Sequence, residues 1–382
     1  MINIHSANVW LPQTQTWMYN IVRNLPKEIE PHIICKQTAN LDQFWLPNIH
    51  NLSNTHCFSF VPANILRGLH ITNDKDLLRR IATRLHAKIL HSHFGHIGWA
   101  DLGVAKKVKA KHVVSFYGFD LSYLPTLEPV WHGRYQELFR EVDCVLCEGS
   151  FMAQGIANLG CPQDKISLHH IGISVKDIQF RPKTWDPSKT LRVLLAASFQ
   201  EKKGIPYALE ALGRLQRDTD LKITIIGDAN NEERSQSEKN KILEVIEKYR
   251  LNDKVTLLSY QPHDTLFREA YRHHIFLSPS ITATDGDTEG GLPVTILEMA
   301  ATGMIIVSTT HCDIPEAIHH GSMGLLTEER DVDGILNHIR WLLNNPEKWH
   351  DMAVNCRKHI EKEYDVNTQA LRLGEIYRGL LQ

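Results

Sequence analysis

The sequence predicts an α/β protein with two doubly wound parallel-sheet domains. Three observations predict this class: the chain has 382 residues, short apolar runs alternate with amphipathic segments, and a polar segment with two prolines lies near the middle. At roughly 150 residues per domain, this length suggests two domains. Apolar runs that alternate with helical patterns are typical of parallel sheets covered by helices on both faces.

The second half shows the alternation most clearly. Apolar runs typical of buried strands occupy residues 191–198, 222–228, 254–260, 274–280 and 304–310. Amphipathic segments lie between them, at 206–218, 238–250, 265–273 and 293–302. In the second of these, Ile242, Ile246 and Tyr249 share one helical face. From Val332 onward the pattern predicts mostly helix.

The first half follows the same pattern less regularly. Its predicted strands are residues 1–6, 32–37, 87–94, 111–118, 144–149 and 166–172. The segment 180–190 is polar and contains two prolines, which predicts a linker between domains. We therefore expect domains at 1–182 and 183–365, with a cleft that faces the carboxyl ends of the strands.

The composition excludes several classes of protein. Lys and Arg number 42 and Asp and Glu number 44, so a net charge of −2 argues against a nucleic-acid binder. No stretch of 18 apolar residues predicts a spanning helix, and the first residues lack the pattern of a signal peptide. Seven scattered cysteines favour a reducing compartment over a disulfide framework. We expect a soluble, cytoplasmic protein.

The segment 285–298 carries most of the functional information. It reads Asp-Gly-Asp-Thr-Glu-Gly-Gly-Leu-Pro-Val-Thr-Ile-Leu-Glu and follows the predicted strand 274–280, so it begins at a carboxyl edge. Gly290 and Gly291 let the backbone approach a ligand, and Pro293 suits the first turn of a helix. A glycine loop that leads into a helix N-terminus suits phosphate or another anion.

Two carboxylates accompany this anion site. Glu289 lies in the loop and Glu298 lies nine positions further on, inside the predicted helix. Carboxylates do not suit the anion itself, but they accept hydrogen bonds from hydroxyl groups. A phosphate flanked by sugar hydroxyls indicates a nucleotide sugar. The alternative is a solvated acidic loop that marks only a tight connection.

A second loop follows the strand at 191–198. It runs from Ser198 to Gly204 as Ser-Phe-Gln-Glu-Lys-Lys-Gly and precedes a predicted helix, so it lies on the same carboxyl edge as the glutamate loop. Lys202 and Lys203 there can neutralise a diphosphate whose charge grows as a glycosidic bond breaks. The alternative is an exposed loop with ordinary charges.

Taken together, these segments resemble the retaining glycosyltransferases of glycosyltransferase family 4, which have the GT-B fold. The resemblance covers essentially the whole chain. Its strongest part runs from Ser198 to Glu316 and contains Glu-Lys-Lys-Gly, Ile-Ile-Gly-Asp, Ser-Pro-Ser, Glu-Gly-Gly-Leu-Pro and Asp-Ile-Pro-Glu. The first half adds His-Ser-His-Phe-Gly at 91–95, Ser-Phe-Tyr-Gly-Phe-Asp at 115–120 and Gly-Cys-Pro at 160–162. The set looks most like transferases that build bacterial exopolysaccharide, capsule or O-antigen units.

The resemblance implies a role for each matching residue of the second domain. Glu289 would face the donor sugar, and Glu298 would accept hydrogen bonds from the ribose hydroxyls. Lys203, with Lys202 as its substitute, would hold the diphosphate. The backbone amides near the sugar and phosphate would be those of Gly290, Gly291 and Leu292.

Further roles follow from the same resemblance. Tyr260 would border the nucleobase, and Ser198, which stands where the family often has an arginine, would belong to the donor-binding set. From the first domain, Asp120 and His93 would approach the sugar or the acceptor. A last helix at 366–382 would cross back to the first domain.

The implied reaction moves a sugar from a nucleotide-diphosphate sugar, such as a UDP-sugar, to a glycan or lipid-linked glycan in surface polysaccharide synthesis. We expect no cofactor and no metal, because the helix dipole and Lys203 would stabilise the leaving group. Asp285 and Asp287 form an Asp-x-Asp pattern that keeps metal use open. The alternatives are a phosphorylase, an epimerase, or a nucleotide-binding module without catalysis. The last of these is favoured by Ser198 and by Tyr117, which stands where the family usually has a histidine.

Three other patterns carry weaker signals. His91, His93 and His96 could bind zinc, but no further ligand is evident, so we expect them to line the cleft. Cys144 and Cys147 have the spacing of a redox motif, but on a strand they face opposite ways, which predicts buried structural thiols. The basic segment 106–111 predicts a solvated helix face, or a peripheral contact with anionic lipid at the inner membrane face.

Overall fold

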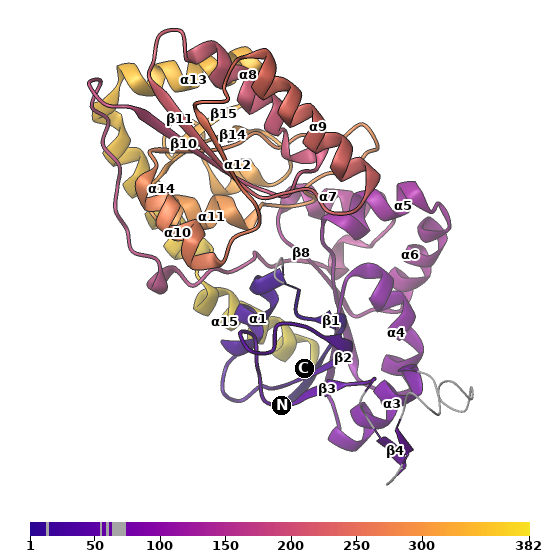
Figure 1. Cartoon of the computed structure of the whole chain (residues 1–382). Coiled ribbons are helices and arrows are strands. Elements are labelled where there is room, and N and C mark those ends of the chain that lie inside the picture. The colour runs from indigo at the N-terminus through magenta and orange to yellow at the C-terminus, as the bar shows by residue number, and fades with distance from the viewer. Residues whose placement is uncertain (13–14, 54–55, 59–60, 63–73) are drawn as a thin grey trace. The chain divides into compact units, whose positions relative to one another are not determined.

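The computed structural model describes residues 1–12, 15–53, 56–58, 61–62 and 74–382. The chain divides into two compact units, which Figure 1 shows in a colour gradient along the sequence. Unit 1 contains Met1–Gly172 together with Asp365–Gln382, and unit 2 contains Ile173–Tyr364. The segment 180–190 holds neither helix nor strand and lies within unit 2.

Unit 1 is built on a parallel sheet in the order β3-β2-β1-β6-β7-β8-β9. Its strands are β1 (Ile2–Trp10), β2 (Glu30–Thr38), β3 (Ile49–Asn51), β6 (Ile89–His93), β7 (Lys111–Ser115), β8 (Cys144–Cys147) and β9 (Ile166–Leu168). Its helices are α1 (Thr16–Arg23), α3 (Asp74–Leu85), α4 (Gly95–Val108), α5 (Leu124–Leu127), α6 (Val130–Glu141), α7 (Ser150–Asn158) and α15 (Val366–Leu380). Strands β4 (His56–Phe58) and β5 (Val61–Pro62) form a small antiparallel pair.

Both faces of this sheet are buried, as its near-continuous apolar strands predict. Neighbouring residues of a strand point to opposite faces. Ile89 therefore packs with Ile21 and Tyr377 on one face, whereas Leu90 packs with Leu78 on the other. The first face is covered by α1 and by α15, which lie side by side in Figure 1 although they come from opposite ends of the sequence.

Unit 2 contains a second parallel sheet, in the order β12-β11-β10-β13-β14-β15. Its strands are β10 (Leu191–Ala196), β11 (Leu221–Ile226), β12 (Val255–Leu258), β13 (Ile275–Ser278), β14 (Ile305–Thr309) and β15 (Gly324–Thr327). Its helices are α8 (Ile205–Leu215), α9 (Glu233–Lys248), α10 (His263–Arg272), α11 (Val294–Ala301), α12 (Ile314–Ala317), α13 (Val332–Asn344) and α14 (Trp349–Glu363). A short helical turn, η5 (Glu201–Lys203), precedes α8.

The predicted α/β class is confirmed, because both sheets are parallel and helices cover them. Every strand predicted in the second half is present with slightly shorter bounds. Strands β3, β4, β5 and β15 were not predicted. In the two large sheets, β3 is the polar tripeptide Ile-His-Asn and β15 begins with a glycine after a turn. Pro293 lies just before α11, at its N-cap position, and not in its first turn.

The strand order of unit 2 reverses between β10 and β13. Chain connections leave these two strands in opposite directions, and ligands of open α/β sheets bind at such a switch point, outside the carboxyl ends. The segments that follow β10 and β13 are residues 197–204 and 279–293, and they contain Lys202, Lys203 and Glu289, whereas Glu298 lies further on, in α11. Along the described part of the chain, no helix is long and apolar enough to cross a bilayer.

Candidate functional site

The two loops at the switch point of unit 2 are held together by their backbones. The N–H of Ile281 donates to the carbonyl of Lys202 over 2.8 Å. Gly204 has φ +63°, and a Cβ at this position would lie 1.9 Å from the carbonyl oxygen of Pro279. Only glycine allows this approach, because it has no Cβ and tolerates the left-handed conformation. The lysines of the first loop are thereby placed against the glutamate loop.

Lys203 and Glu289 form an ion pair at this contact. The Nζ of Lys203 lies 2.9 Å from Oε1 and 2.6 Å from Oε2 of Glu289, and the hydroxyl of Ser280 donates to Oε1 over 2.8 Å. The Glu289 side chain is only 6% exposed. Burial alone would raise the pKa of Glu289, but the charges of Lys203 and Lys202 lower it below its usual value. Glu289 is therefore an anion with one oxygen already fixed by a hydroxyl donor.

Lys202 faces the same loop through a different carboxylate. Its Nζ lies 2.9 Å from Oδ1 of Asp287 and donates to the carbonyl of Thr288 over 3.0 Å. Arg234 of α9 lies 3.5 Å from the other oxygen of Asp287. A polar pocket of about 220 Å³ opens beside these residues. Two cations thus neutralise Asp287, the second member of the Asp-x-Asp pattern.

His311, which the sequence did not single out, holds the backbone of Glu289 through a hydrogen bond. The backbone N–H of Glu289 donates to Nε2 of His311 over 3.1 Å. Nδ1 of His311 therefore carries the hydrogen and donates to Glu329 over 2.6 Å. Glu329 also accepts from the N–H of Thr282 over 2.8 Å. His311 lies two residues after β14, the strand beside β13. Its position at the same carboxyl edge of the sheet was the signal by which the sequence could have indicated it.

Glu298 lies apart from this cluster, on α11, and contacts His263 at the start of α10. Nε2 of His263 lies 2.9 Å from Oε1 of Glu298. The hydrogen bond to Glu298 raises the pKa of His263 above its usual value. The Glu298 side chain keeps 12% of its surface exposed. One of its oxygens has a described donor, and the carboxylate can accept further hydrogen bonds.

The remaining predicted donor-binding residues all lie in unit 2. The N–H of Gly290 donates to the hydroxyl of Thr288 over 3.0 Å, and the carbonyl of Gly291 accepts from Asp313 over 3.4 Å. Leu292 is buried in the core of unit 2. Two further residues lie at loops after other strands, namely Ser198 after β10 and Tyr260 after β12. The exposed Tyr260 donates its hydroxyl to the carbonyl of Asp228 over 2.9 Å.

The predicted residues of unit 1 are both buried. Asp120 is fully buried and accepts from the backbone N–H groups of Gly95 and Tyr117, the latter over 2.8 Å. Burial raises the pKa of Asp120 to about 7. Nδ1 of His93 lies 2.9 Å from the hydroxyl of Tyr117, and Nε2 lies 2.9 Å from Nδ1 of His5. Asp120 and His93 thus hold the loop that carries Tyr117, and their predicted contact with sugar or acceptor stays a prediction.

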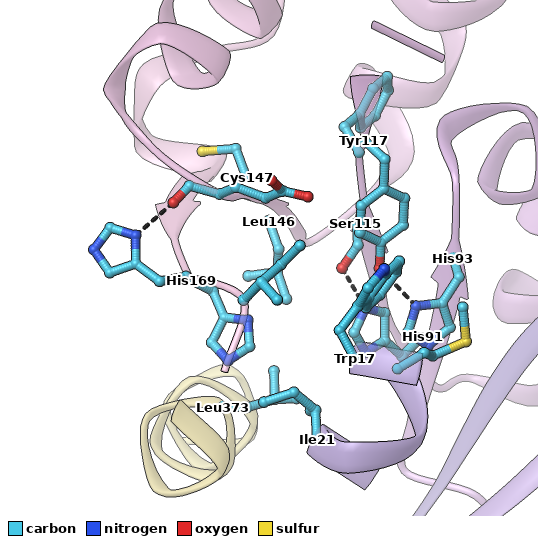
Figure 2. A pocket seen from close by; sticks show the side chains of 15 residues that line it. Trp17, Ile21, His91, His93, Ser115, Tyr117, Leu146, Cys147, His169 and Leu373 are labelled. Atoms are coloured by element: carbon cyan, nitrogen blue, oxygen red, sulfur yellow. Dashed lines mark hydrogen bonds between the residues drawn. The ribbon is translucent and has the colours of Figure 1, made fainter. Parts of the chain in front are cut away.

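A small cavity of about 30 Å³ lies next to this loop. Figure 2 shows Trp17, His91, His93, Ser115 and Tyr117 at its wall. His96 is not part of the lining of this cavity, and its ring packs against the rings of Phe119 and Trp131. Cys144 and Cys147 are buried free thiols, which confirms their predicted burial.

Comparisons with known proteins show the family of this chain. Residues 177–359 match the family described as Glycosyl transferases group 1, and residues 14–177 match Glycosyltransferase Family 4. The colanic acid biosynthesis glycosyltransferase WcaL of Escherichia coli is 30% identical over 308 residues, which cover 79% of this chain and 73% of the relative. The amylovoran biosynthesis glycosyltransferase AmsK of Erwinia amylovora is 31% identical over 300 residues, which cover 77% and 70%.

Solved structures share the fold over nearly the whole chain. Anabaena HepE in complex with UDP and glucose has a TM-score of 0.78 at 14% identity, covering 99% of this chain and all of HepE. The sucrose-phosphate synthase of Thermosynechococcus elongatus has a TM-score of 0.73 at 14% identity, with coverage of 100% and 99%. These structures show the GT-B fold. The family matches and the relatives show that the chain belongs to the glycosyltransferases of group 1 and family 4.

Proposed function

We propose that the protein is a retaining glycosyltransferase that moves a sugar from a nucleotide-diphosphate sugar to a glycan or lipid-linked glycan during surface polysaccharide synthesis. The relatives named for colanic acid and amylovoran biosynthesis support this biological role. HepE, whose structure contains UDP and glucose, supports the donor class. The observation that carries the proposal is the Lys203–Glu289 pair at the switch point of the unit 2 sheet.

In this proposal the diphosphate takes the place of Glu289 at Lys203. The Lys203 side chain is paired with Glu289 and is 19% exposed, so an incoming diphosphate can reach it. Once the diphosphate holds Lys203, Glu289 faces the sugar and accepts from its hydroxyls. Lys203 and the N-terminus of α11 then stabilise the charge that grows on the leaving diphosphate. Lys202 stays with Asp287 and supports the loop from its other side.

The nucleoside is proposed to bind at Glu298 and Tyr260. Ribose hydroxyls donate well to a carboxylate, and Glu298 keeps an exposed surface for them. His263 orients this carboxylate from the side of α10. The exposed ring of Tyr260 lies in the loop between β12 and α10, three residues before His263, and offers a face on which the base can stack.

The reaction is proposed to retain the anomeric configuration and to need no metal. The acceptor hydroxyl attacks on the face from which the diphosphate departs, and a donor phosphate oxygen takes its proton. Lys203 and the N-terminus of α11 supply the positive charge that a metal would otherwise supply. Asp287 is unsuited to hold a cation while Lys202 and Arg234 neutralise it.

Asp120 and His93 are proposed to act on the sugar or acceptor side. Both bond to Tyr117, one at its backbone N–H and the other at its hydroxyl. Tyr117 lines the cavity of unit 1. Changing either residue would therefore move Tyr117 and raise KM for the acceptor.

A panel of UDP, GDP, ADP and their sugars, added to the purified protein in EDTA, tests the donor. We expect one base to stabilise the protein selectively, since a ligand at 100 times its Kd adds about 2.7 kcal/mol. NMR of the product then assigns the anomer. No stabilisation by any diphosphate would reject the donor proposal. Turnover without an acceptor, or turnover that needs inorganic phosphate, would instead indicate an epimerase or a phosphorylase.

Peripheral membrane contact is proposed at the basic segment 106–111, which is part of unit 1. Lys106 is 79% exposed, and Lys111 lies 2.9 Å from Asp143. Sedimentation with anionic and neutral vesicles tests this contact. We expect salt-sensitive binding to anionic vesicles only, and equal binding to both vesicle types would reject it.

A further inference from the structure

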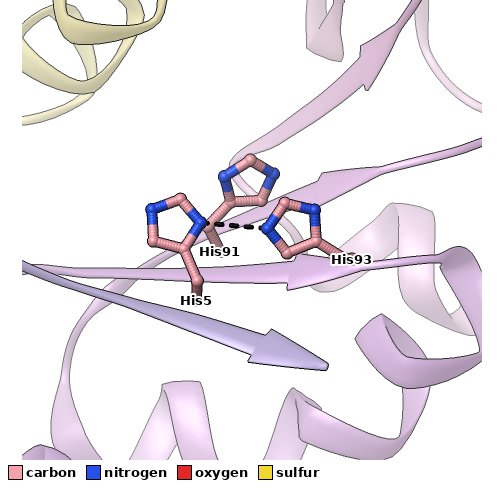
Figure 3. A group of neighbouring side chains, drawn as sticks. All are labelled: His5, His91 and His93. Atoms are coloured by element: carbon pink, nitrogen blue, oxygen red, sulfur yellow. Dashed lines mark hydrogen bonds between the residues drawn. The ribbon is translucent and has the colours of Figure 1, made fainter. Parts of the chain in front are cut away.

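Three histidines of unit 1 meet on one face of its central strands. His91 and His93 are two positions apart on β6 and therefore share a face. Strand β1 pairs with β6 in parallel, and His5 lies directly opposite His91 in the register. Sequence spacing could suggest only the first two residues, because the third comes from a strand more than 80 positions earlier. Figure 3 shows the three imidazole rings gathered above the two strands.

The ring nitrogens of this cluster lie close enough together to approach one ion. Nδ1 of His5 is 2.9 Å from Nε2 of His93, and one nitrogen from each of the three rings lies within 4.8 Å of the others. All three residues are 1–3% exposed. Tetrahedral zinc with Zn–N bonds of about 2.0 Å sets its ligand nitrogens about 3.3 Å apart, so His5 and His93 need to separate by only about 0.4 Å.

The chemical state of the rings suits a cation. Burial lowers the pKa of His5 to about 3 and lowers the pKa of His91 and of His93 well below the usual value. The rings are therefore neutral, and each has a nitrogen lone pair to offer. Three neutral imidazoles are an established ligand set for zinc.

The groups around the rings can hold them in the required tautomers. A metal-bound imidazole donates its other N–H to an oxygen nearby. The Tyr117 hydroxyl is 2.9 Å from Nδ1 of His93, on the far side from His5. Nε2 of His5 lies 2.9 Å from the Asn3 amide, whose oxygen is buried and has no hydrogen-bond partner in the described structure. Turning this amide over gives its oxygen the N–H of His5 and leaves Nδ1 of His5 free for a cation.

His91 completes the set. Its Nδ1 lies 2.6 Å from the hydroxyl of Tyr377 and its Nε2 lies 2.7 Å from the hydroxyl of Ser115. A change of the Ser115 side-chain rotamer takes its oxygen away and leaves Nε2 of His91 for the ion, while Nδ1–H of His91 donates to Tyr377. The neighbouring cavity of about 30 Å³, which His91 and His93 also line, has room for a water as fourth ligand.

We propose that His5, His91 and His93 form a binding site for a divalent transition metal, with zinc as the best match. Binding moves the hydrogen of His5 from Nδ1 to Nε2, and no proton leaves the site. The bound ion joins β1 to β6 in the centre of the unit 1 sheet. This site is separate from the donor residues of unit 2 and does not depend on the proposed transferase activity.

Zinc titration of the chelator-treated, full-length protein against a chromogenic chelator tests the site. We expect one tight equivalent per chain, an increase in Tm, and, with Co²⁺, a visible absorption typical of low coordination number. His5→Gln and His93→Gln should weaken the tight equivalent at least 100-fold. His32→Gln is the matched control, because His32 and His50 are also stacked, with nitrogens 3.1 Å apart, but lie outside the cluster.

The outcomes are distinct. Absence of a tight equivalent in the wild-type protein overturns the proposal, and so does a tight equivalent that survives both cluster substitutions, because it then belongs to other histidines. If a cluster variant fails to fold, the Co²⁺ spectrum and zinc stabilisation of the wild-type protein still decide. Stabilisation by nucleotides reports on unit 2, so failure of that test is recognised separately.

Discussion

Lys203 touches both carboxylate oxygens of Glu289, and Ser280 donates to one of the same oxygens. The pair joins the segment between β10 and α8 to the loop after β13. Its two members are the residues proposed for leaving-group stabilisation and for contact with the donor sugar. The anion site and the sugar site are therefore coupled, because a ligand that takes Lys203 releases Glu289.

Lys203→Met should reduce kcat by about 10²–10³-fold, the usual loss when a preorganised charge is removed from a transition state. The Kd of the nucleoside diphosphate should change less. Initial rates and isothermal titration measure the two effects. Lys189→Met is the control, because Lys189 is 72% exposed and pairs only with Asp186 among the described ion pairs. A kcat within threefold of wild type would contradict the role of Lys203.

Removing Glu289 alone should destabilise the unliganded protein. Glu289→Gln leaves the largely buried Lys203 ammonium without its counter-ion, which costs about 3 kcal/mol. The double variant Lys203→Met/Glu289→Gln should regain most of this loss. Urea unfolding of the four proteins in the cycle measures the coupling. Additive losses in the double variant would show that the two groups do not interact.

Glu298→Gln should weaken nucleotide binding about 10- to 100-fold, because hydrogen bonds to a charged group contribute about 1.5–3 kcal/mol. Binding of the free base is expected to change little, since the lost acceptor serves the ribose. His263→Gln keeps a donor beside Glu298 and should have a smaller effect. Titration with nucleoside, deoxynucleoside and base separates these contributions, and equal weakening of all three would argue against ribose recognition.

Gly204→Ala should destabilise the protein by about 3 kcal/mol. A side chain there adopts the unfavourable left-handed conformation and meets the carbonyl of Pro279 at 1.9 Å. Gly103→Ala is the matched control, because Gly103 lies within α4 and its Cβ would meet nothing within 4 Å. That change should stabilise by about 0.5–1 kcal/mol. Thermal unfolding of both variants should therefore show shifts of opposite sign.

Acid should destabilise unit 1 through His112. Burial lowers the pKa of His112 to about 4, against about 6.5 in the unfolded chain. The unfolded state thus binds a proton first, and stability that is full above pH 6.5 is lost as the pH falls toward 4. At pH 5 the loss is about 2 kcal/mol from this residue. His112→Asn, compared by urea unfolding at pH 7.5 and 5.0, should lose about 2 kcal/mol less than wild type, and an equal loss would exclude His112 as the cause.

Strong local patterns made most of the unit 2 fold predictable. Its strands are continuous apolar runs that end in glycine, serine or proline, so sequence alone located β10, β11 and β13 within a few residues. The sequence also predicted that Lys203 and Glu289 lie near each other, because both follow strands of one parallel sheet and the carboxyl ends of such strands lie at the same edge. Strand β15 escaped prediction because four residues that begin with glycine carry no periodicity.

The residues that sequence reasoning missed act through tertiary contacts. His311 lies in the loop after β14, and its sequence context does not distinguish it from other loop histidines. The register of β13 and β14 places it where it accepts a hydrogen bond from the backbone N–H of Glu289. His5 pairs with His93 only because β1 and β6 are neighbours in the sheet. His96, which the spacing grouped with His91 and His93, begins α4 and turns toward aromatic rings instead. Such pairings depend on strand order, which one sequence without relatives does not specify.

Helix α15 has a consequence for synthesis on the ribosome. Its residues Leu373 and Tyr377 pack against Ile89 and Val113 of the unit 1 sheet, whereas unit 2 is one uninterrupted segment. A nascent chain emerges from its N-terminus, and domains generally fold as units. Unit 2 can therefore fold to completion first, while the sheet whose strands are made earliest still lacks α15 on a face that α1 covers only in part. The older half of the polypeptide is the last to be finished, and this interval is when it most needs a chaperone.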